Sequence, residues 1–406
     1  MSDDAPSLEE FLAQAEAFLA ARWPRKEATR GPAPFVWGEG SDEMKVFQEP
    51  EPAEEADRMA AVRSWRRALF DAGYAWITGP AEHGGRNLPS RYERAFGALT
   101  RRFDVPGDAM LTVSLGMIAP TIWRFGSPDQ HARWLPALRS GELIACQLFS
   151  EPNAGSDLAS LSTKAEPDGR GGWRISGQKV WTSGAHLADV GEIICRTSDG
   201  PRHQNLTAFI VDMRAPGVEV RPLRQMTGGA AFNEVFLTDV AVGDDARLGD
   251  VGEGWKVAVA TLGFERSAMG HSDFGGVGLL RTDRLAAMLR HTGAVDDPVA
   301  RQDFARVVVA LRAARCLQSR TGAMAKAGDL PTPALSMNKI ALSDNFRRLS
   351  DFAVRTLGPA VTADTGEWGT YAWTSVLLGT PGYRLGGGTD QILKNILAER
   401  VLGLPR

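Results

Sequence analysis

A turn at residues 149–157 holds residue types that are well suited to binding chemistry. It follows an apolar run and combines the hydroxyls of Ser150 and Ser156 with the small residue Gly155. Backbone N–H groups that such a turn leaves free can donate hydrogen bonds to an anion. The same residue types also occur in ordinary connections between strands. The turn alone therefore leaves both interpretations open.

A second segment, residues 178–184, contains a large, flat aromatic side chain. Trp181 is followed directly by Thr182 and Ser183. An indole can belong to the core, but two hydroxyls beside it would be hard to satisfy inside a buried strand. Taken in this order, the two segments favour a site for a planar, partly anionic ring that takes part in hydrogen bonds. A flavin is such a ring.

A base for this chemistry is predicted on a helix that follows residue 252. Four apolar residues share one face of this helix: Trp255, Ala258, Val259 and Leu262. Glu265 and Arg266 fall on the same stripe. A carboxylate on an apolar stripe is costly unless it is paired or neutral, and its pKa is often raised. A buried Glu–Arg ion pair is one interpretation, and a general base in a dry cleft is the other.

Three glycines, residues 386–388, precede an amphipathic helix near the end of the chain. Thr389 or Asp390 can cap this helix. Glycines let a ligand approach the backbone and the positive end of the helix dipole. A flexible loop before a helix is the plainer interpretation.

Other motifs predict less. Residues 172–179 nearly match a phosphate-binding loop, but they lie between strands and have no Ser or Thr after Lys179, so a hairpin turn is predicted. No Rossmann, nucleophile-elbow or zinc-protease motif occurs in the sequence. The six histidines are scattered without ligand spacing, and no metal site is predicted.

Composition restricts partners and location. The 406 residues carry a net charge of -3 without a basic run, which gives no reason to expect a nucleic acid. No run of about 18 apolar residues predicts a membrane span, and the acidic first residues do not resemble a signal peptide. Three widely separated cysteines suggest a reducing compartment. A soluble cytoplasmic protein is predicted.

The elements that must position these residues follow the order helical, small β, helical. Helical spacing predicts helices at 8–19, 58–70, 91–102, 117–125 and 128–138, with a long exposed connection at 31–52. About seven short strands between 143 and 242 predict a sandwich or barrel. From residue 254 the pattern is helical again. The expected domains are residues 1–141, 142–245 and 246–406.

Several ordered motifs now resemble one family over nearly the whole chain. They lie at residues 126–130, 135–136, 150–157, 177–184, 387–389 and 396–400. The chain resembles the acyl-CoA dehydrogenases, in particular bacterial members with the base on the Glu-Arg helix. The resemblance implies an α+β fold, mostly α, with an N-terminal helical domain, a central β-barrel and a C-terminal four-helix bundle. It implies FAD as the cofactor.

The resemblance also implies roles for matched positions. The residues implied to bind FAD are Gln147, Phe149, Ser150, Gly155, Ser156, Trp181, Thr182, Ser183, Thr389 and Gln391. Residues implied to contact the substrate are Ser156, Arg266 and Gly387. Phe149 and Ser150 would approach the pyrimidine edge of the flavin. Trp181 would cover its dimethylbenzene end, with Ser183 near N5.

The implied reaction removes a proton from Cα of an acyl-CoA thioester while a hydride leaves Cβ for flavin N5, giving the trans-2-enoyl-CoA. Many family members carry the base in a Glu-Gly-Thr element, where this chain has Gly387. A minority place it on the helix that here carries Glu265, so Glu265 is the expected base. The enzyme would be an oxidoreductase of lipid metabolism that passes electrons to an electron-transfer flavoprotein or a similar acceptor.

Two alternatives stay open. A flavin monooxygenase or oxidase could use the same scaffold, although such an enzyme needs no base for an α-proton. The chain could instead be a non-catalytic subunit that completes a partner's flavin site. A homodimer or homotetramer is expected, or a heteromer with a paralogue, since some bacterial members work as two-subunit assemblies.

Overall fold

The computed structural model describes residues 5–27, 35–44, 51–269, 280–327 and 331–405. The chain divides into two compact units, which are described separately. The first comprises Met1–Pro32, Pro50–Leu223 and Phe232–Phe264. The second comprises Ala33–Glu49, Arg224–Ala231 and Glu265–Arg406. Among the described helices, none is long and apolar enough to cross a membrane.

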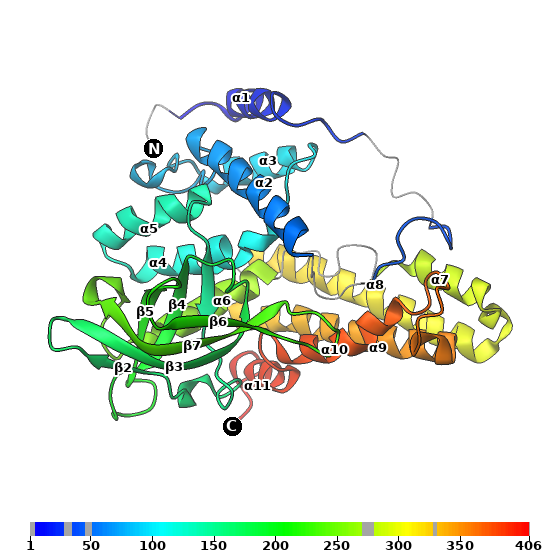
Figure 1. Ribbon diagram of the computed structural model, residues 1–406. Helices are drawn as coiled ribbons and strands as arrows, with labels where there is room; N and C mark the ends of the chain where they lie inside the picture. The colour runs from blue at the N-terminus through cyan, green and yellow to red at the C-terminus, as the bar shows by residue number, and fades with distance from the viewer. Residues whose placement is uncertain (1–4, 28–34, 45–50, 270–279, 328–330, 406) are drawn as a thin grey trace. The chain divides into compact units, whose positions relative to one another are not determined.

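The first unit begins with helices, two of which start at a serine cap. The helices are α1 Leu8–Ala20, α2 Pro52–Asp71, α3 Ser90–Thr100, α4 Ala119–Phe125 and α5 Pro128–Ser140, shown from blue to cyan-green in Figure 1. Ser7 and Ser127 each form a capping box, with Glu10 and Gln130 respectively. Helix α1 packs on α3, while α5 packs on both α2 and α4. The helices predicted from periodicity are therefore present.

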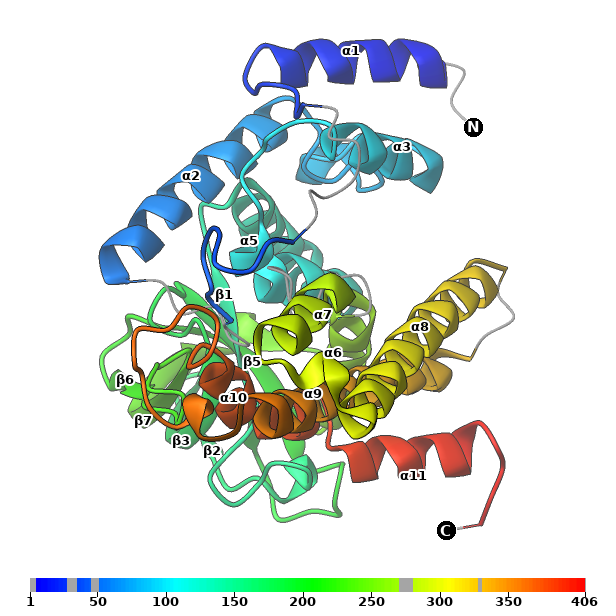
Figure 2. The ribbon, with the colours of Figure 1, turned by 90° about the vertical axis from the view of Figure 1, so that its right-hand side faces the viewer.

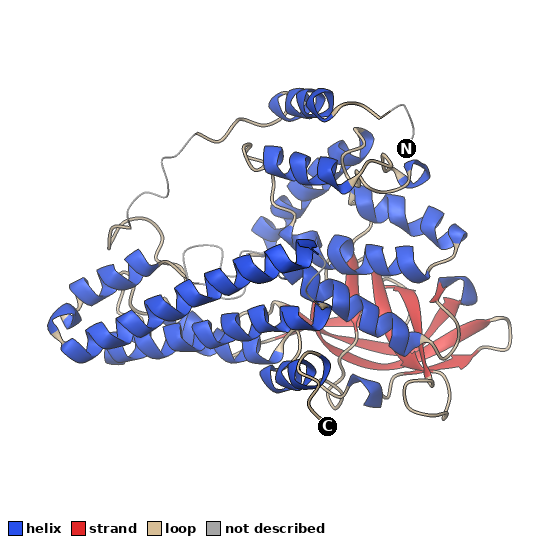
Figure 3. Ribbon diagram, turned by 180° about the vertical axis from the view of Figure 1, so that it is seen from behind, coloured by secondary structure: helices blue, strands red, loops and turns tan. Residues whose placement is uncertain are grey.

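The strands of the first unit form one sheet, drawn in red in Figure 3. Its members are β1 Ala145–Leu148, β2 Lys164–Pro167, β3 Gly172–Ser183, β4 Val190–Arg196, β5 Leu206–Asp212, β6 Val218–Leu223, β7 Phe232–Gly243 and β8 Arg247–Leu248. The order is β6-β7-β3-β2-β4-β5-β8, and β1 pairs in parallel with β4. Strands β4 and β5 are buried along nearly their whole length, so the core of this unit lies around them.

One expectation about this sheet is wrong. Residues 172–179 are not a hairpin turn, because they form the first part of β3. The turn lies just before them, where Asp168 N–H donates to the carbonyl of Gly172 across 2.9 Å. The Gly-rich composition that suggested a turn instead accompanies a register shift between Ile175 and Gly177 against β7.

Helix α6, Gly254–Met269, packs through most of the expected face, with Ala258 in the core and Trp255 and Leu262 against it, but not through Val259. Val257, Ala258 and Thr261 have no exposed surface, whereas Val259 is 40% exposed. The buried stripe therefore runs through residues 257, 258 and 261, and spacing by four residues continues it to Glu265.

The second unit is helical. It contains α7 Thr282–His291, α8 Pro298–Ala327, α9 Ser336–Leu357, α10 Trp373–Leu385 and α11 Asp390–Arg400. Helix α9 packs against α8, α10 and α11, and these helices run from yellow to red in Figure 2. Phe346, Leu349 and Trp373 are buried in the core of this unit.

The connection expected to be exposed is partly buried. Met44 is 1% exposed and packs with the core of the second unit, and Trp37 stacks on His291 with ring centroids 4.7 Å apart. Residues 31–34 and 45–50 of that connection lie outside the described residues. The Pro and Glu content of the connection suggested solvent exposure. Its Trp37 and Met44 side chains instead pack within the second unit.

Candidate cofactor cradle and base

The turn after β1 is closed by backbone hydrogen bonds. Glu151 and Ala154 exchange two such bonds, each 3.1 Å long. Val180 N–H donates to the carbonyl of Ser150 at 2.9 Å, which ties the turn to β3. Phe149 is buried, whereas Gly155 and Ser156 are exposed. The turn predicted from sequence is thus held beside the strand that carries Trp181.

A buried ion pair between Lys179 of β3 and Glu151 of the turn holds the turn against the sheet. Lys179 has no exposed surface, and its Nζ donates to Glu151 Oε1 at 2.9 Å, to the carbonyl of Phe149 at 3.1 Å and to that of Ile194 at 2.9 Å. Glu151 also accepts from the N–H of Ser162 at 2.7 Å. All three donor positions of the ammonium are therefore used.

The pKa of Glu151 shows which effect dominates at this pair. Burial alone would raise the pKa of Glu151, but the charge of Lys179 and the hydrogen bonds that the carboxylate accepts lower it to about 2. Burial lowers the pKa of Lys179, and the charge of Glu151 opposes that shift. We infer that both groups are charged at neutral pH, since each side chain satisfies the other.

Trp181 is turned outward by an irregularity in β3. Two residues of β3, Val180 and Trp181, stand opposite Glu234 of β7, between the pairs Lys179–Val235 and Thr182–Asn233. The backbone of Trp181 has φ +61°, which is uncommon for a residue other than glycine. Its indole is 57% exposed and meets Phe232 edge-on at 5.8 Å. The flat face of the ring is therefore available to a ligand.

Two buried polar atoms of the predicted site residues have no partner among the described residues. They are the Nε2 of Gln147, on β1, and the Oγ1 of Thr182, next to Trp181. Buried polar groups are nearly always hydrogen-bonded, and the predicted ring would supply partners for these two atoms. The exposed side chain of Ser183 and the half-buried side chain of Ser150 complete the polar lining. These residues fit a flat ring with polar edges, as FAD has.

Glu265 lies in the second unit and is half-buried. Burial raises the pKa of Glu265, and the charge of Arg266 opposes the shift. Burial lowers the pKa of Arg266, Glu265 raises it, and Arg400 of α11 lowers it further. Among the described residues, no ion pair joins Glu265 and Arg266 directly. The arrangement is that of a carboxyl whose proton affinity is raised, as a general base requires.

The glycine loop before α11 is anchored. Gly387 and Gly388 have φ values of +65° and +89°, which favour glycine. Lys339 Nζ donates to the carbonyl of Gly388 at 2.9 Å and to Asp390 Oδ1 at 3.2 Å. Thr389 caps the helix through the N–H of Ile392 at 3.1 Å. The loop is therefore ordered rather than simply flexible.

The predicted residues are divided between the two units, and contacts of the turn with β3 bring those of the first unit together. The group in the first unit consists of Gln147, Phe149, Ser150, Gly155, Ser156, Trp181, Thr182 and Ser183. The group in the second unit consists of Glu265, Arg266, Gly387, Thr389 and Gln391. Sequence reasoning assigned no role to Lys179 or Glu192. The sequence signal that could have identified these two residues is a charged residue inside an otherwise apolar strand.

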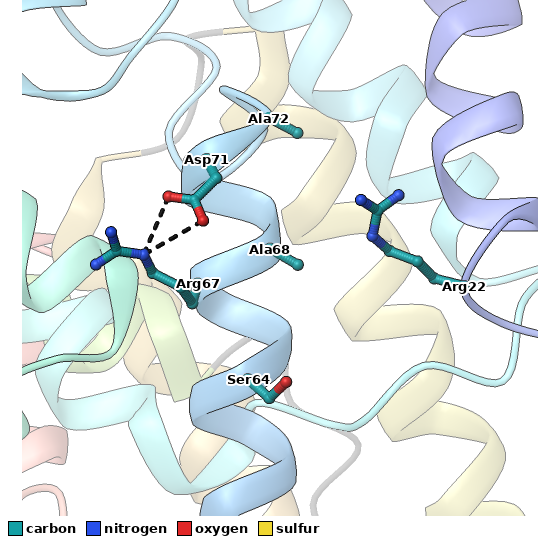
Figure 4. Close-up of a pocket in the computed structure, with 6 residues that line it drawn as sticks. All are labelled: Arg22, Ser64, Arg67, Ala68, Asp71 and Ala72. Carbon is teal, nitrogen blue, oxygen red and sulfur yellow. Dashed lines mark hydrogen bonds and ion pairs between the residues drawn. The ribbon is translucent and has the colours of Figure 1, made fainter.

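The first unit also has a surface hollow of about 440 Å³ between Arg22 and one face of α2. Arg67 and Asp71 form an ion pair in it with an N–O distance of 3.0 Å (Figure 4). None of the predicted site residues lines this hollow.

The sequence matches both models of protein families and known proteins. Family models match for the acyl-CoA dehydrogenase N-terminal domain at residues 43–142, the middle domain at 146–240 and the C-terminal domain at 252–402. The chain is 39% identical to acyl-CoA dehydrogenase IpdE1 of Mycobacterium tuberculosis over 365 residues, covering 87% of this chain and 91% of that protein.

Two further comparisons concern a longer relative and a solved structure. Acyl-CoA dehydrogenase FadE34 of Mycobacterium tuberculosis is 41% identical over 290 residues, which are 71% of this chain and 39% of that protein. The solved structure described as the Tcur3481-Tcur3483 steroid ACAD superposes with a TM-score of 0.71 at 24% identity, with complete coverage of both chains. The present chain therefore has the same fold as this solved structure.

Proposed function

The chain belongs to the acyl-CoA dehydrogenase family, and from this premise we propose that it performs the α,β-dehydrogenation of an acyl-CoA thioester with Glu265 as the base. As a member of this family it is an FAD-dependent oxidoreductase. The proposal concerns the residues that carry out the reaction and their roles.

The reaction requires a base of raised proton affinity. An α-proton of a thioester is far less acidic than a carboxylic acid, so an ordinary carboxylate with a low pKa is poorly matched to it. Burial raises the pKa of Glu265. The Cα–H electron pair becomes the new Cα=Cβ bond, the proton goes to a Glu265 carboxylate oxygen, and the hydride leaves Cβ. Bound FAD supplies the hydride acceptor at N5.

The residues around the turn would hold the cofactor. The Oγ1 of Thr182 and the Nε2 of Gln147 lack partners and are available to polar edges of the ring. The exposed indole of Trp181 offers a stacking face. The Lys179–Glu151 pair takes no part in the reaction and keeps the turn against β3. We assign Thr389 and Gln391 to further cofactor contacts by resemblance.

The missing side chain in the glycine loop supports this position of the base. Gly387 occupies the place where many family members carry a glutamate, and it offers no side chain. Arg266 stands next to Glu265 on α6 and would help to bind the acyl-CoA. Its charge would also lower the energy of the ionised carboxylate before proton transfer.

The observation that carries the proposal is the raised pKa of Glu265. Glu265 lies on the same stripe of α6 as the buried Thr261. The proposal is tested with Glu265→Gln, purified with FAD bound. We expect the variant to keep its flavin spectrum but not to be bleached by acyl-CoA under anaerobic conditions. Glu253→Gln, which removes a carboxylate just before α6, is the matched control and should be bleached as the wild type is. Normal bleaching of Glu265→Gln would rule out this base.

We further propose an electron-transfer flavoprotein or a similar protein as the electron acceptor. Assembly would be a homodimer or homotetramer, or a heteromer with a paralogue. Exposed apolar side chains on the helices of the second unit support self-association, among them Val309 at 66% and Leu385 at 65% exposure. Light scattering of the FAD-loaded chain alone, and with a co-expressed paralogue, separates these assemblies. A monomer in both samples would contradict the proposal.

A further inference from the structure

Glu192 is a carboxyl in the middle of the core of the first unit. It lies on β4, has no exposed surface, and is in register with Gln147 of β1 and Ile210 of β5. Its Oε1 accepts from the hydroxyl of Thr261 at 2.7 Å, while its Oε2 has no partner among the described residues. A buried acid without a cation requires an explanation, because isolated buried charges are strongly disfavoured.

Two hydroxyls connect this carboxyl to two helices. Thr261 of α6 lies 2.8 Å from Thr121 of α4, measured between their Oγ1 atoms, and neither residue has exposed surface. Each threonine has a single hydroxyl hydrogen. Thr121 Oγ1 also lies 2.8 Å from the carbonyl of Met117, so three close contacts share the two hydroxyl hydrogens. A protonated carboxyl of Glu192 supplies the third donor.

Glu192 also has a direct neighbour on the cradle strand β1. Gln147 and Glu192 are direct partners on parallel strands, so their side chains project from the same face of the sheet. The Nε2 of Gln147 is the other buried polar atom of this strand pair that has no partner among the described residues. Gln147 belongs to the strand that leads into the 149–157 turn.

The charged and titratable groups nearby do not compensate an ionised Glu192. Lys179 reaches β4 at the carbonyl of Ile194, but its charge is matched by Glu151. Burial raises the pKa of the thiols of Cys146 and Cys195 to about 12, so both stay neutral. Burial likewise raises the pKa of Glu192 to about 8, against the hydrogen bond from Thr261.

We propose that Glu192 is a positioning residue that holds α6 and the cradle strand β1 in register while its carboxyl is protonated. Thr261, four residues before Glu265, is the hydrogen-bond partner of Glu192 on α6, and Gln147 stands opposite Glu192 on β1. This inference rests on the proposed function, because α6 carries the proposed base. Ionisation of Glu192 would put an unpaired charge into the core and loosen the cradle.

The proposal makes FAD affinity depend on pH in a defined direction. The binding-competent form is the protonated one, which is present below about pH 8 and is lost above it. Because a single proton is involved, the Kd for FAD should rise about tenfold between pH 7 and pH 9. Glu192→Gln carries a permanently neutral amide of similar shape, so its Kd should stay nearly constant over the same range.

The test is a fluorescence titration of FAD against the apoprotein of wild type and Glu192→Gln at several pH values. Infrared spectra of the FAD-loaded proteins at pH 7 should show a protonated carboxyl band in the wild type that is missing in the variant. Equal pH dependence in both proteins, or no difference in that band, would overturn the proposal. Glu265→Gln should keep the wild-type pH dependence of FAD affinity. The two proposals can therefore fail separately.

A second variant covers the case in which Glu192→Gln does not fold. Thr261→Val removes a hydrogen bond that stabilises the ionised carboxylate, so the pKa of Glu192 should rise further. The pH at which FAD affinity falls should then move upward relative to wild type. An unchanged or lower midpoint would contradict the role of the carboxyl.

Discussion

Replacing Lys179 with methionine should destabilise the first unit strongly, because it leaves a buried carboxylate without its cation. Lys179 has no exposed surface and Glu151 is 5% exposed, so solvent cannot take the place of the ammonium. The depression of the pKa of Glu151 from 4.5 to about 2 corresponds to about 3 kcal/mol of stabilisation of the carboxylate. Removing one partner of a buried pair typically costs about 3–5 kcal/mol. We expect a loss in this range.

The assay is thermal unfolding of the FAD-loaded protein as a function of pH. At about 2 °C per kcal/mol for a unit of this size, the midpoint of Lys179→Met should fall by roughly 6–10 °C at neutral pH. The stabilisation from Glu151 is present above its unfolded pKa of 4.5 and is lost as pH falls through the folded value of about 2. The difference between wild type and variant should therefore shrink as pH falls below about 4.5.

Two controls separate this effect from general damage. The double variant Lys179→Met/Glu151→Gln removes both charges and should recover most of the lost stability. Arg174→Met breaks the exposed Arg174–Asp239 pair and should cost less than about 1 kcal/mol. A midpoint for Lys179→Met within 2 °C of the wild type, or a loss that is the same at every pH, would refute the reasoning.

Three further variants test other parts of the account. Trp181→Ala should weaken FAD binding by about twofold to tenfold, measured by fluorescence titration, with little change in thermal stability because the indole is 57% exposed. Thr182→Val removes a buried hydroxyl without a partner, so the apoprotein should be at least as stable as the wild type while FAD affinity falls; unchanged affinity would exclude this contact. Glu192→Gln should gain about 3 kcal/mol of stability relative to the wild type between about pH 5 and pH 7.5. The reason is that the unfolded carboxyl ionises near 4.5 and the folded one near about 8. Denaturant midpoints that move in parallel for both proteins would contradict it.

The order of elements could be predicted from sequence because local patterns determine it. Ser127 and Gln130 form a capping box at the start of the helix that was predicted at 128–138. The alternation of apolar runs with Gly, Pro and Asp gave the central strands, and the observed sheet has one more strand than the seven expected, the short β8 Arg247–Leu248. Segments of fifteen or more residues with helical spacing became α8 and α9.

Features that depend on distant partners could not be predicted in the same way. The burial of Lys179 is tolerable only because Glu151, 28 residues earlier, meets it. Glu192 is held by Thr261, 69 residues later. Val259 was assigned to the buried stripe of α6, but neighbours in space, not helical periodicity alone, leave it 40% exposed. The turn and the outward indole of Trp181 were correctly expected to be adjacent.

The central claim is that Glu265 removes the α-proton, and one measurement addresses it most directly. FAD-loaded Glu265→Gln and wild type are mixed anaerobically with a panel of acyl-CoAs, and the rate of flavin bleaching is followed at equal flavin content. Loss of a general base predicts a rate lower by about 10²–10⁴-fold for every acyl-CoA that bleaches the wild type, with FAD still bound. Bleaching of the variant at the wild-type rate would contradict the claim and place the base elsewhere.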